Sequence, residues 1–177
     1  MKAHTADRIF QIYTQRVLPF ADVGIRVKDA SLQVWLHYLF QSFGDVAELS
    51  ILDFGAASGH KAMLFSVLGA HVIAIDIASE AIKRMQNARR DSRIKFDIVQ
   101  GDISALEAFK GESFDRILCS EVIEHIPENT LPRFCNSIER VLKPGSKMFL
   151  ITPNYEVYGP AECSPEYYRG FNYQVQL

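Results

Sequence analysis

Three apolar runs in this sequence end in or beside an aspartate, and the first of them leads into a loop of small residues. Asp53 precedes the loop Gly55-Ala-Ala-Ser-Gly59, while Asp76 and Asp102 close two later runs. A strand, a glycine-bearing turn and a helix start together form a cradle for a cofactor. An acid directly before the loop disfavours a pyrophosphate there. It favours a ligand that carries a positive group.

A second set of reactive side chains, Glu121, Glu124 and His125, follows the apolar run 114–119. In an α-helical turn these three would share one face. Two carboxylates and an imidazole can bind a divalent cation. Alternatively, His125 can act as general base on a hydroxyl, since a free imidazole has a pKa near ~6.5. A third interpretation, in which the segment only begins a helix or lines a substrate pocket, stays open.

Alternating strands and helices must position these residues. Strands are predicted over 51–54, 71–75, 94–99, 114–119 and 147–152, and helices over 61–68, 79–89 (Ser79 as N-cap), 103–109 and 130–142. This order predicts an α/β fold with a doubly wound, mostly parallel sheet. Ligands bind beyond the carboxyl ends of such strands, where Asp53, Asp76, Asp102 and Glu121 fall.

The residues before this core carry a helical pattern. Apolar residues from Ile9 to Leu18 follow helical spacing until Pro19 stops the pattern. A second helix is predicted from Lys28 or Asp29 to about Phe43. Gly44 is expected as its C-cap.

Residues 51–154 resemble a class I S-adenosylmethionine-dependent methyltransferase with a Rossmann-like fold. The resemblance rests on ordered motifs: Ile-Leu-Asp-Phe-Gly-Ala-Ala-Ser-Gly (51–59), Val-Ile-Ala-Ile-Asp (72–76), Val-Gln-Gly-Asp-Ile (99–103), Phe-Asp-Arg-Ile-Leu-Cys-Ser-Glu-Val-Ile-Glu-His-Ile (114–126), Leu-Lys-Pro-Gly-Ser (142–146) and Thr-Pro-Asn (152–154). It implies S-adenosyl-L-methionine as cofactor.

The resemblance assigns roles along these motifs. Asp53 would attract the cationic cofactor or its ammonium, Asp76 would accept the ribose hydroxyls, and Asp102 the adenine amino group. The full cofactor-binding set is Asp53, Gly55, Ala57, Gly59, Asp76, Ile77, Asp102, Ile103 and Ser120, with Ile77 and Ile103 sandwiching the adenine. Ala57 stands where the family usually has glycine, which costs ~1 kcal/mol if the loop needs a positive φ there.

The resemblance also bears on catalysis. Glu124 and His125 are the expected catalytic residues. Two metal-using branches, the ubiquinone-pathway O-methyltransferases and the small-RNA 2′-O-methyltransferases, share the Glu-x-x-Glu-His segment, so Glu121, Glu124 and His125 form an alternative metal set. The RNA branch adds a later histidine, and none follows His125 here. The prediction is therefore no metal.

We expect methyl transfer to an O or N atom of an acceptor that is a small molecule. The alternatives are a non-catalytic methyltransferase-like scaffold or an RNA 2′-O-methyltransferase. A dinucleotide-dependent dehydrogenase is disfavoured because the sequence lacks Gly-x-Gly-x-x-Gly.

The resemblance divides the chain into an N-terminal helical lid (1–48), an S-adenosylmethionine-binding core (49–154) and a Tyr-rich tail (155–177). A weak strand pattern lies at 171–177. The family sheet continues after the fifth strand with a helix and an antiparallel pair, but only 25 residues follow Thr152. We therefore expect an incomplete sheet, from a truncated chain or from an exposed edge that pairs in a homodimer.

Composition limits the partners. The 177 residues carry a net charge of −2, with 48% hydrophobic and 23% charged residues, so a bulk nucleic-acid surface is not expected. The basic run 83–95 is interpreted as a solvated helix face. Three cysteines without CxxC spacing predict a reduced, cytoplasmic protein. No signal peptide or membrane span is predicted.

Overall fold

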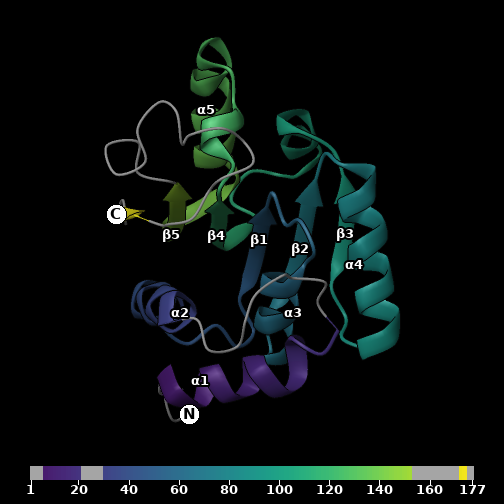
Figure 1. The fold of residues 1–177 in the computed structure, drawn as a ribbon. Coiled ribbons are helices and arrows are strands. Elements are labelled where there is room, and N and C mark those ends of the chain that lie inside the picture. The colour runs from purple at the N-terminus through teal and green to yellow at the C-terminus, as the bar shows by residue number, and fades with distance from the viewer. Residues whose placement is uncertain (1–5, 21–29, 153–171, 175–177) are drawn as a thin grey trace, which may run out of the picture.

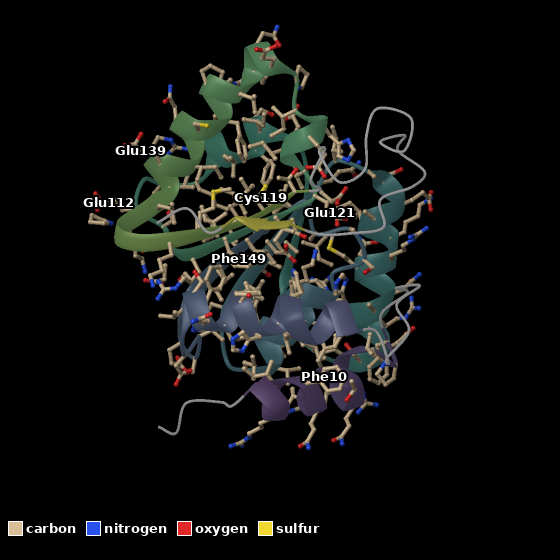
Figure 2. All side chains as sticks on the ribbon, turned by 60° about the vertical axis from the view of Figure 1, so that its left-hand side comes forward. Phe10, Glu112, Cys119, Glu121, Glu139 and Phe149 are labelled. Atoms are coloured by element: carbon tan, nitrogen blue, oxygen red, sulfur yellow. The ribbon has the colours of Figure 1, made fainter. Side chains whose placement is uncertain are left out.

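The computed structural model describes residues 6–20, 30–152 and 172–174. Its centre is a sheet in the order β3-β2-β1-β4-β5-β6, and helices lie on both faces (Figures 1 and 2). The strands are β1 Ser50–Phe54, β2 His71–Asp76, β3 Asp97–Gln100, β4 Phe114–Ser120, β5 Leu142–Thr152 and β6 Asn172–Gln174. β1 to β5 are mutually parallel. The predicted α/β class and doubly wound parallel sheet are confirmed.

The helical elements follow the predicted alternation. They are α1 Ala6–Ile12, the π-helix η1 Tyr13–Val17, α2 Ala30–Phe43, α3 His60–Val67, α4 Ser79–Ser92, the 3₁₀ turns η2 Ile103–Ala108, η3 Ile123–His125 and η4 Glu128–Thr130, and α5 Leu131–Val141. Figure 2 shows α5 on one side of the sheet and α1 and α2 on the other. No helix within the described ranges has the length and apolar character needed to cross a bilayer.

Two hydrophobic cores lie between the sheet and the helices on its two faces. In β1, Ile51 faces one core and its neighbour Leu52 faces the other, as the two-residue period of a strand requires. The first core holds buried residues of the N-terminal helices, α3, α4 and the sheet, and the second is closed by η2 and α5. Strands buried on both faces explain why the sequence shows short continuous apolar runs rather than alternation.

The C-terminal end of α2 is tied to the sheet by two cations. The Arg116 side chain donates from Nε to the Phe43 carbonyl (3.2 Å), and Lys147 donates from Nζ to the Ser42 carbonyl (3.1 Å). Gly44 follows with φ +71°, and its amide donates to the Phe40 carbonyl (2.9 Å), as predicted for a C-cap. Positive charge at a helix C-terminus is favourable because the last carbonyls carry partial negative charge.

The structure corrects several local predictions. Ser79 is not the N-cap of α4: Ala78 is, and its amide donates to Asp76 Oδ1 (2.9 Å). The strand predicted from residue 94 begins at Asp97, because Arg93 ends α4 with φ +59°. Both differences arise where a loop residue, rather than the periodic pattern, decides the boundary.

The predicted exposed edge at the fifth strand is wrong over its last three residues. Leu150, Ile151 and Thr152 pair with β6 in antiparallel register. β6 falls within the weak strand pattern at 171–177, while the rest of the predicted tail lies outside the described residues. Part of the physical reason for a homodimer is thereby removed, and the homodimer itself stays a prediction.

Candidate functional site

The loop between β1 and α3 requires its two glycines. Gly55 has φ +79° and Gly59 has φ +76°. A Cβ on Gly55 would lie 2.1 Å from Val122 Cγ2, and one on Gly59 would lie 2.7 Å from Met85 Cγ. Both positions therefore combine a left-handed backbone with close packing, which excludes other residues.

Ala57 adopts the positive φ that is costly for a residue with a Cβ. Its φ is +50°, in the left-handed region that a Cβ disfavours. Its amide donates to Asp76 Oδ2 (2.8 Å), which ties the loop to the end of β2. The loop thus holds residue 57 in a left-handed conformation without the glycine that favours it.

Most backbone donors of this loop are already used inside the protein. The amides of Gly55 and Ala56 both donate to the Ile75 carbonyl (2.8 and 2.9 Å), and that of Gly59 donates to the Ala56 carbonyl (2.8 Å). With the Ala57 amide bound as described, four amides are satisfied. A pyrophosphate site at a helix start needs free amides, so this arrangement supports the prediction against a dinucleotide.

Asp53 is a buried carboxylate near the end of β1. Its relative exposure is 1%, and neither carboxylate oxygen accepts a hydrogen bond. Burial raises its pKa to about 6, although the positive charge of Lys61 and the nearby Ala62 amide act in the opposite direction. An isolated buried charge is costly, so this position suits a cationic ligand.

The next two strand ends meet at one place. The Gly101 amide donates to the Asp76 carbonyl (3.0 Å), which joins the ends of β2 and β3. Asp102 caps η2: its Oδ1 accepts from the Ser104 amide (2.8 Å) and hydroxyl (2.6 Å), and these bonds lower the pKa of Asp102. Ile77 is 69% exposed beside them, a large apolar side chain left uncovered.

The two remaining predicted cofactor residues are less exposed than Ile77. Ile103 packs against the second core at the start of η2. Ser120 is buried at the end of β4. The structure thus brings the nine predicted residues to the carboxyl ends of β1 to β4.

The segment after β4 does not form the α-helical turn that would align its three reactive residues. Glu121 has φ +57°, and the 3₁₀ turn η3 covers only Ile123–His125. In the described part of the chain, no group of three or more His, Cys, Asp or Glu side chains is placed to hold a metal ion. The shared face on which the metal alternative depended is therefore wrong.

Two glutamates nevertheless join Asp53 in what we name the acidic cluster: Asp53, Glu121 and Glu124. Glu121 Oε1 and Glu124 Oε1 are buried and accept no hydrogen bond. Glu124 Oε2 accepts from the Thr152 hydroxyl (3.3 Å), at the end of β5. Burial raises the pKa of Glu121, while Lys61 opposes that rise. The cluster places several unpartnered carboxylate oxygens at adjacent strand ends.

Sequence reasoning missed Lys61. This residue lies in the first turn of α3, with its ammonium 5.6 Å from the centre of the Trp35 ring of α2. Burial lowers its pKa, and the charges of Asp53 and Glu121 act against that change. The available signal was its place in the sequence, because a lysine just after the glycine loop begins the helix beside Asp53.

His60, the first residue of α3, is partly buried. Its Nδ1 lies 3.0 Å from Ser58 Oγ, and its ring packs edge-on against Tyr13 (centroids 6.1 Å apart). Burial holds its pKa well below the ordinary value. The contact brings the N-terminal π-helix to the start of α3.

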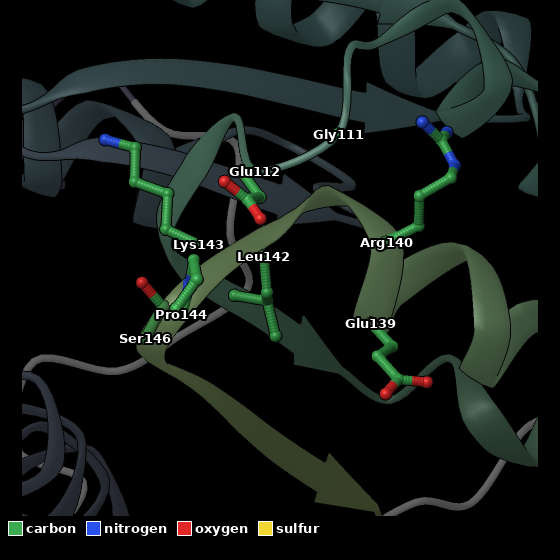
Figure 3. A pocket seen from close by; sticks show the side chains of 8 residues that line it. All are labelled: Gly111, Glu112, Glu139, Arg140, Leu142, Lys143, Pro144 and Ser146. Atoms are coloured by element: carbon green, nitrogen blue, oxygen red, sulfur yellow. The ribbon is translucent and has the colours of Figure 1, made fainter.

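A surface pocket of about 680 Å³ lies elsewhere, at the opposite end of the sheet from Glu121 (Figures 2 and 3). Lys143 and Arg140 lie on opposite sides of it (Figure 3). Both serve the fold: Lys143 pairs with Asp115 (2.8 Å), and Arg140 donates to the Phe109 and Leu106 carbonyls (2.8 and 2.7 Å). This pocket is separate from the predicted site.

Comparisons with known proteins identify a family for this chain. The family model described as a methyltransferase domain matches residues 52–150. A ubiquinone biosynthesis O-methyltransferase from Xanthomonas oryzae pv. oryzae is 37% identical over 111 residues, 62% of this chain and 45% of the relative. The chain thus spans less than half the length of the curated relatives it matches.

Solved structures share the fold. A SAM-dependent methyltransferase from Methanosarcina mazei has a TM-score of 0.60 at 26% identity, with 67% of this chain and 59% of that chain covered. One from Archaeoglobus fulgidus has a TM-score of 0.59 at 22% identity, with 70% and 52% covered. Since the family model covers more than half of the sequence, this chain belongs to the methyltransferase-domain family.

Proposed function

We propose that the protein binds S-adenosyl-L-methionine and transfers its methyl group to an O or N atom of a small-molecule acceptor. The observation that carries this proposal is Asp53: a buried carboxylate with two unpartnered oxygens, behind a loop in which four amides are already bound. Such a site favours a cation over a phosphate.

The other strand ends fit the rest of the cofactor. Asp76 spends one hydrogen bond per oxygen on the Ala57 and Ala78 amides, which leaves lone pairs for ribose hydroxyls. The exposed Ile77 offers an apolar surface for the adenine, with Ile103 on the neighbouring element. When bound, the cofactor supplies a methyl group on a sulfonium, which an acceptor nucleophile displaces in line.

For an acceptor hydroxyl, we assign the proton to His125. The side chain of His125 is exposed beyond β4, where a substrate can reach it. Glu124 is anchored by Thr152 and keeps one buried oxygen free to orient a neighbouring group. General-base catalysis contributes about 10²–10⁴-fold, and positioning of the acceptor supplies much of the remainder.

The name of the curated relatives supports a small acceptor with a hydroxyl group. We further propose that the helices described within the predicted lid (1–48) cover this site, supported by the contact of Tyr13 with His60; residues 1–5 and 21–29 of that range lie outside the described residues. A cytoplasmic location is proposed on the free thiols of Cys119 and Cys135.

The test is calorimetric titration with S-adenosylmethionine and with NADH. We expect heat with the first and none with the second. A methyl-transfer assay with radiolabelled cofactor then compares small phenols and amines with a single-stranded RNA. Transfer only to RNA would favour the RNA alternative, and no cofactor binding would favour the scaffold.

His125→Asn is expected to lower kcat by about 10²-fold or more with a hydroxyl acceptor, while cofactor binding stays unchanged. The matched control is His71→Asn, an exposed histidine at the opposite end of the sheet. Equal kcat values for the two variants would remove His125 from the role of base.

A further inference from the structure

Lys61 lies near an aromatic ring and two acidic side chains. Its ammonium lies against the Trp35 ring on α2, and its strongest charge partners are the carboxylates of Asp53 and Glu121. One comes from the end of β1 and the other follows β4, strands that pair directly. Lys61 therefore faces two acids from neighbouring strands of the sheet.

This attraction is not closed into a hydrogen-bonded ion pair. Both oxygens of Asp53 and Oε1 of Glu121 are buried and accept no hydrogen bond. A buried pair normally compensates its desolvation by direct hydrogen bonds. Here the buried oxygens of the two acids keep their bonding capacity, although a cation lies near them.

A ligand with the complementary pattern would satisfy all three groups. The amino-acid tail of S-adenosylmethionine carries an ammonium and a carboxylate on the same carbon, and its sulfonium makes the whole molecule cationic. The carboxylate of Asp53 on β1 and the ammonium of Lys61 on α3 have the charges that complement such a tail.

We propose that Lys61 binds the α-carboxylate of the cofactor's amino-acid tail, while Asp53 accepts its ammonium. This inference rests on the proposed function and adds a specificity-determining residue to it. Ligands without the tail carboxylate are then bound weakly. Polyphosphate ligands are repelled by Asp53 and Glu121.

The competing role for Lys61 is that of a counter-ion that only neutralises the acidic cluster. The two roles differ in their response to the ligand. A carboxylate-binding lysine senses whether the ligand has a carboxylate, whereas a counter-ion affects all cofactor analogues similarly.

The experiment is a cycle of two ligands and two proteins, measured by calorimetry without turnover. The ligands are S-adenosylmethionine and its decarboxylated analogue, and the variant is Lys61→Met. We expect the wild-type protein to bind the analogue about tenfold more weakly or worse, as for a charged hydrogen bond. The variant should lose that preference. Lys110→Met, at an exposed position before β4, should keep it.

The wild-type preference for S-adenosylmethionine over its decarboxylated analogue should also persist at about 0.5 M salt, since a buried ion pair is screened less than a surface one. Equal wild-type affinities for the two ligands would overturn the role of Lys61 while leaving the proposed function intact. A preference retained in Lys61→Met would overturn it too. A wild-type protein that binds neither ligand would overturn the proposed function itself.

If Lys61→Met fails to fold, as shown by circular dichroism, Lys61→Gln replaces it. The wild-type comparison of the two ligands stands without any variant.

Discussion

Asp53 lowers the stability of the ligand-free protein at neutral pH, although the same buried carboxylate is proposed to bind the cationic cofactor. Burial raises its pKa to about 6, so the folded state binds the proton more tightly than the unfolded chain. Its contribution to stability is therefore fully present below the unfolded pKa and is lost as the pH rises through about 6. At neutral pH the ionised carboxylate costs on the order of 3 kcal/mol.

Asp53→Asn should consequently stabilise the ligand-free protein by about 3 kcal/mol at pH 7.5, and the gain should shrink steadily towards pH 4. Urea denaturation at several pH values measures this. The same variant should bind S-adenosylmethionine more than about tenfold more weakly. Asp97→Asn, at an exposed position of β3, is the control. A gain of equal size at all pH values would contradict the assignment.

Ala57 carries backbone strain that glycine would relieve. Because its φ is +50°, Ala57→Gly should raise the free energy of unfolding by about 1 kcal/mol. Ala56→Gly is the matched control: this neighbour is buried and lies outside the positive-φ residues, so its replacement should destabilise. Chemical denaturation of both variants decides the sign. Destabilisation by Ala57→Gly would show that the Cβ makes contacts that outweigh the strain.

Among elements, the cofactor loop and the segment after β4 are fitted to each other. The absence of a Cβ at Gly55 makes room for Val122, which lies next to Glu121. The Glu121 amide in turn donates to the Ile151 carbonyl (2.8 Å). A side chain added at Gly55 would therefore displace Val122 and, with it, the adjacent Glu121 of the acidic cluster.

Gly55→Ala should lower stability by about 2–4 kcal/mol, because it adds both a steric clash and a disfavoured φ. Adding Val122→Ala should recover the steric part, about half of the loss, since the φ of residue 55 stays positive. A double-mutant cycle by urea denaturation measures this coupling. Strict additivity would mean that the two elements are not in contact.

At the scale of the whole molecule, the N-terminal helices share one core with the sheet. Ile9 and Tyr13 are at most 1% exposed and belong to the same cluster as Phe65 of α3 and Phe149 of β5. N-terminal helices packed in this way unfold with the rest of the domain rather than as a separate unit.

Ile9→Ala should therefore lower the global free energy of unfolding by about 2–5 kcal/mol. Gln11→Ala, on the exposed side of the same helix, should change it by less than about 0.5 kcal/mol. Hydrogen exchange of amides in β1 and β4 reports global unfolding. If Ile9→Ala accelerated exchange only in α1 and η1, the predicted division between 1–48 and 49–154 would be a real unit boundary.

Much of this fold was predictable because local patterns and chain topology agree. Apolar runs followed by small residues placed β1, β2 and β4 and the helices between them, within a few residues. The boundaries that failed, at Ser79 and Arg93, depend on single hydrogen bonds or single φ values that periodicity does not encode. The prediction of an α-helical turn after β4 failed for the same reason, since Glu121 adopts a left-handed conformation and a 3₁₀ turn follows it.

The sequence by itself determined the fold class, the family and the strand ends at which its aspartates gather, since spacing and residue type carry that information. Only the tertiary structure decided which buried acids lack hydrogen bonds. Glu121 is far from Asp53 and Lys61 in the chain, and the burial and missing hydrogen bonds of the two acids arise from the packing of β1, β4 and α3 around them. Desolvation depends on everything that surrounds a side chain, and a linear pattern does not contain that information.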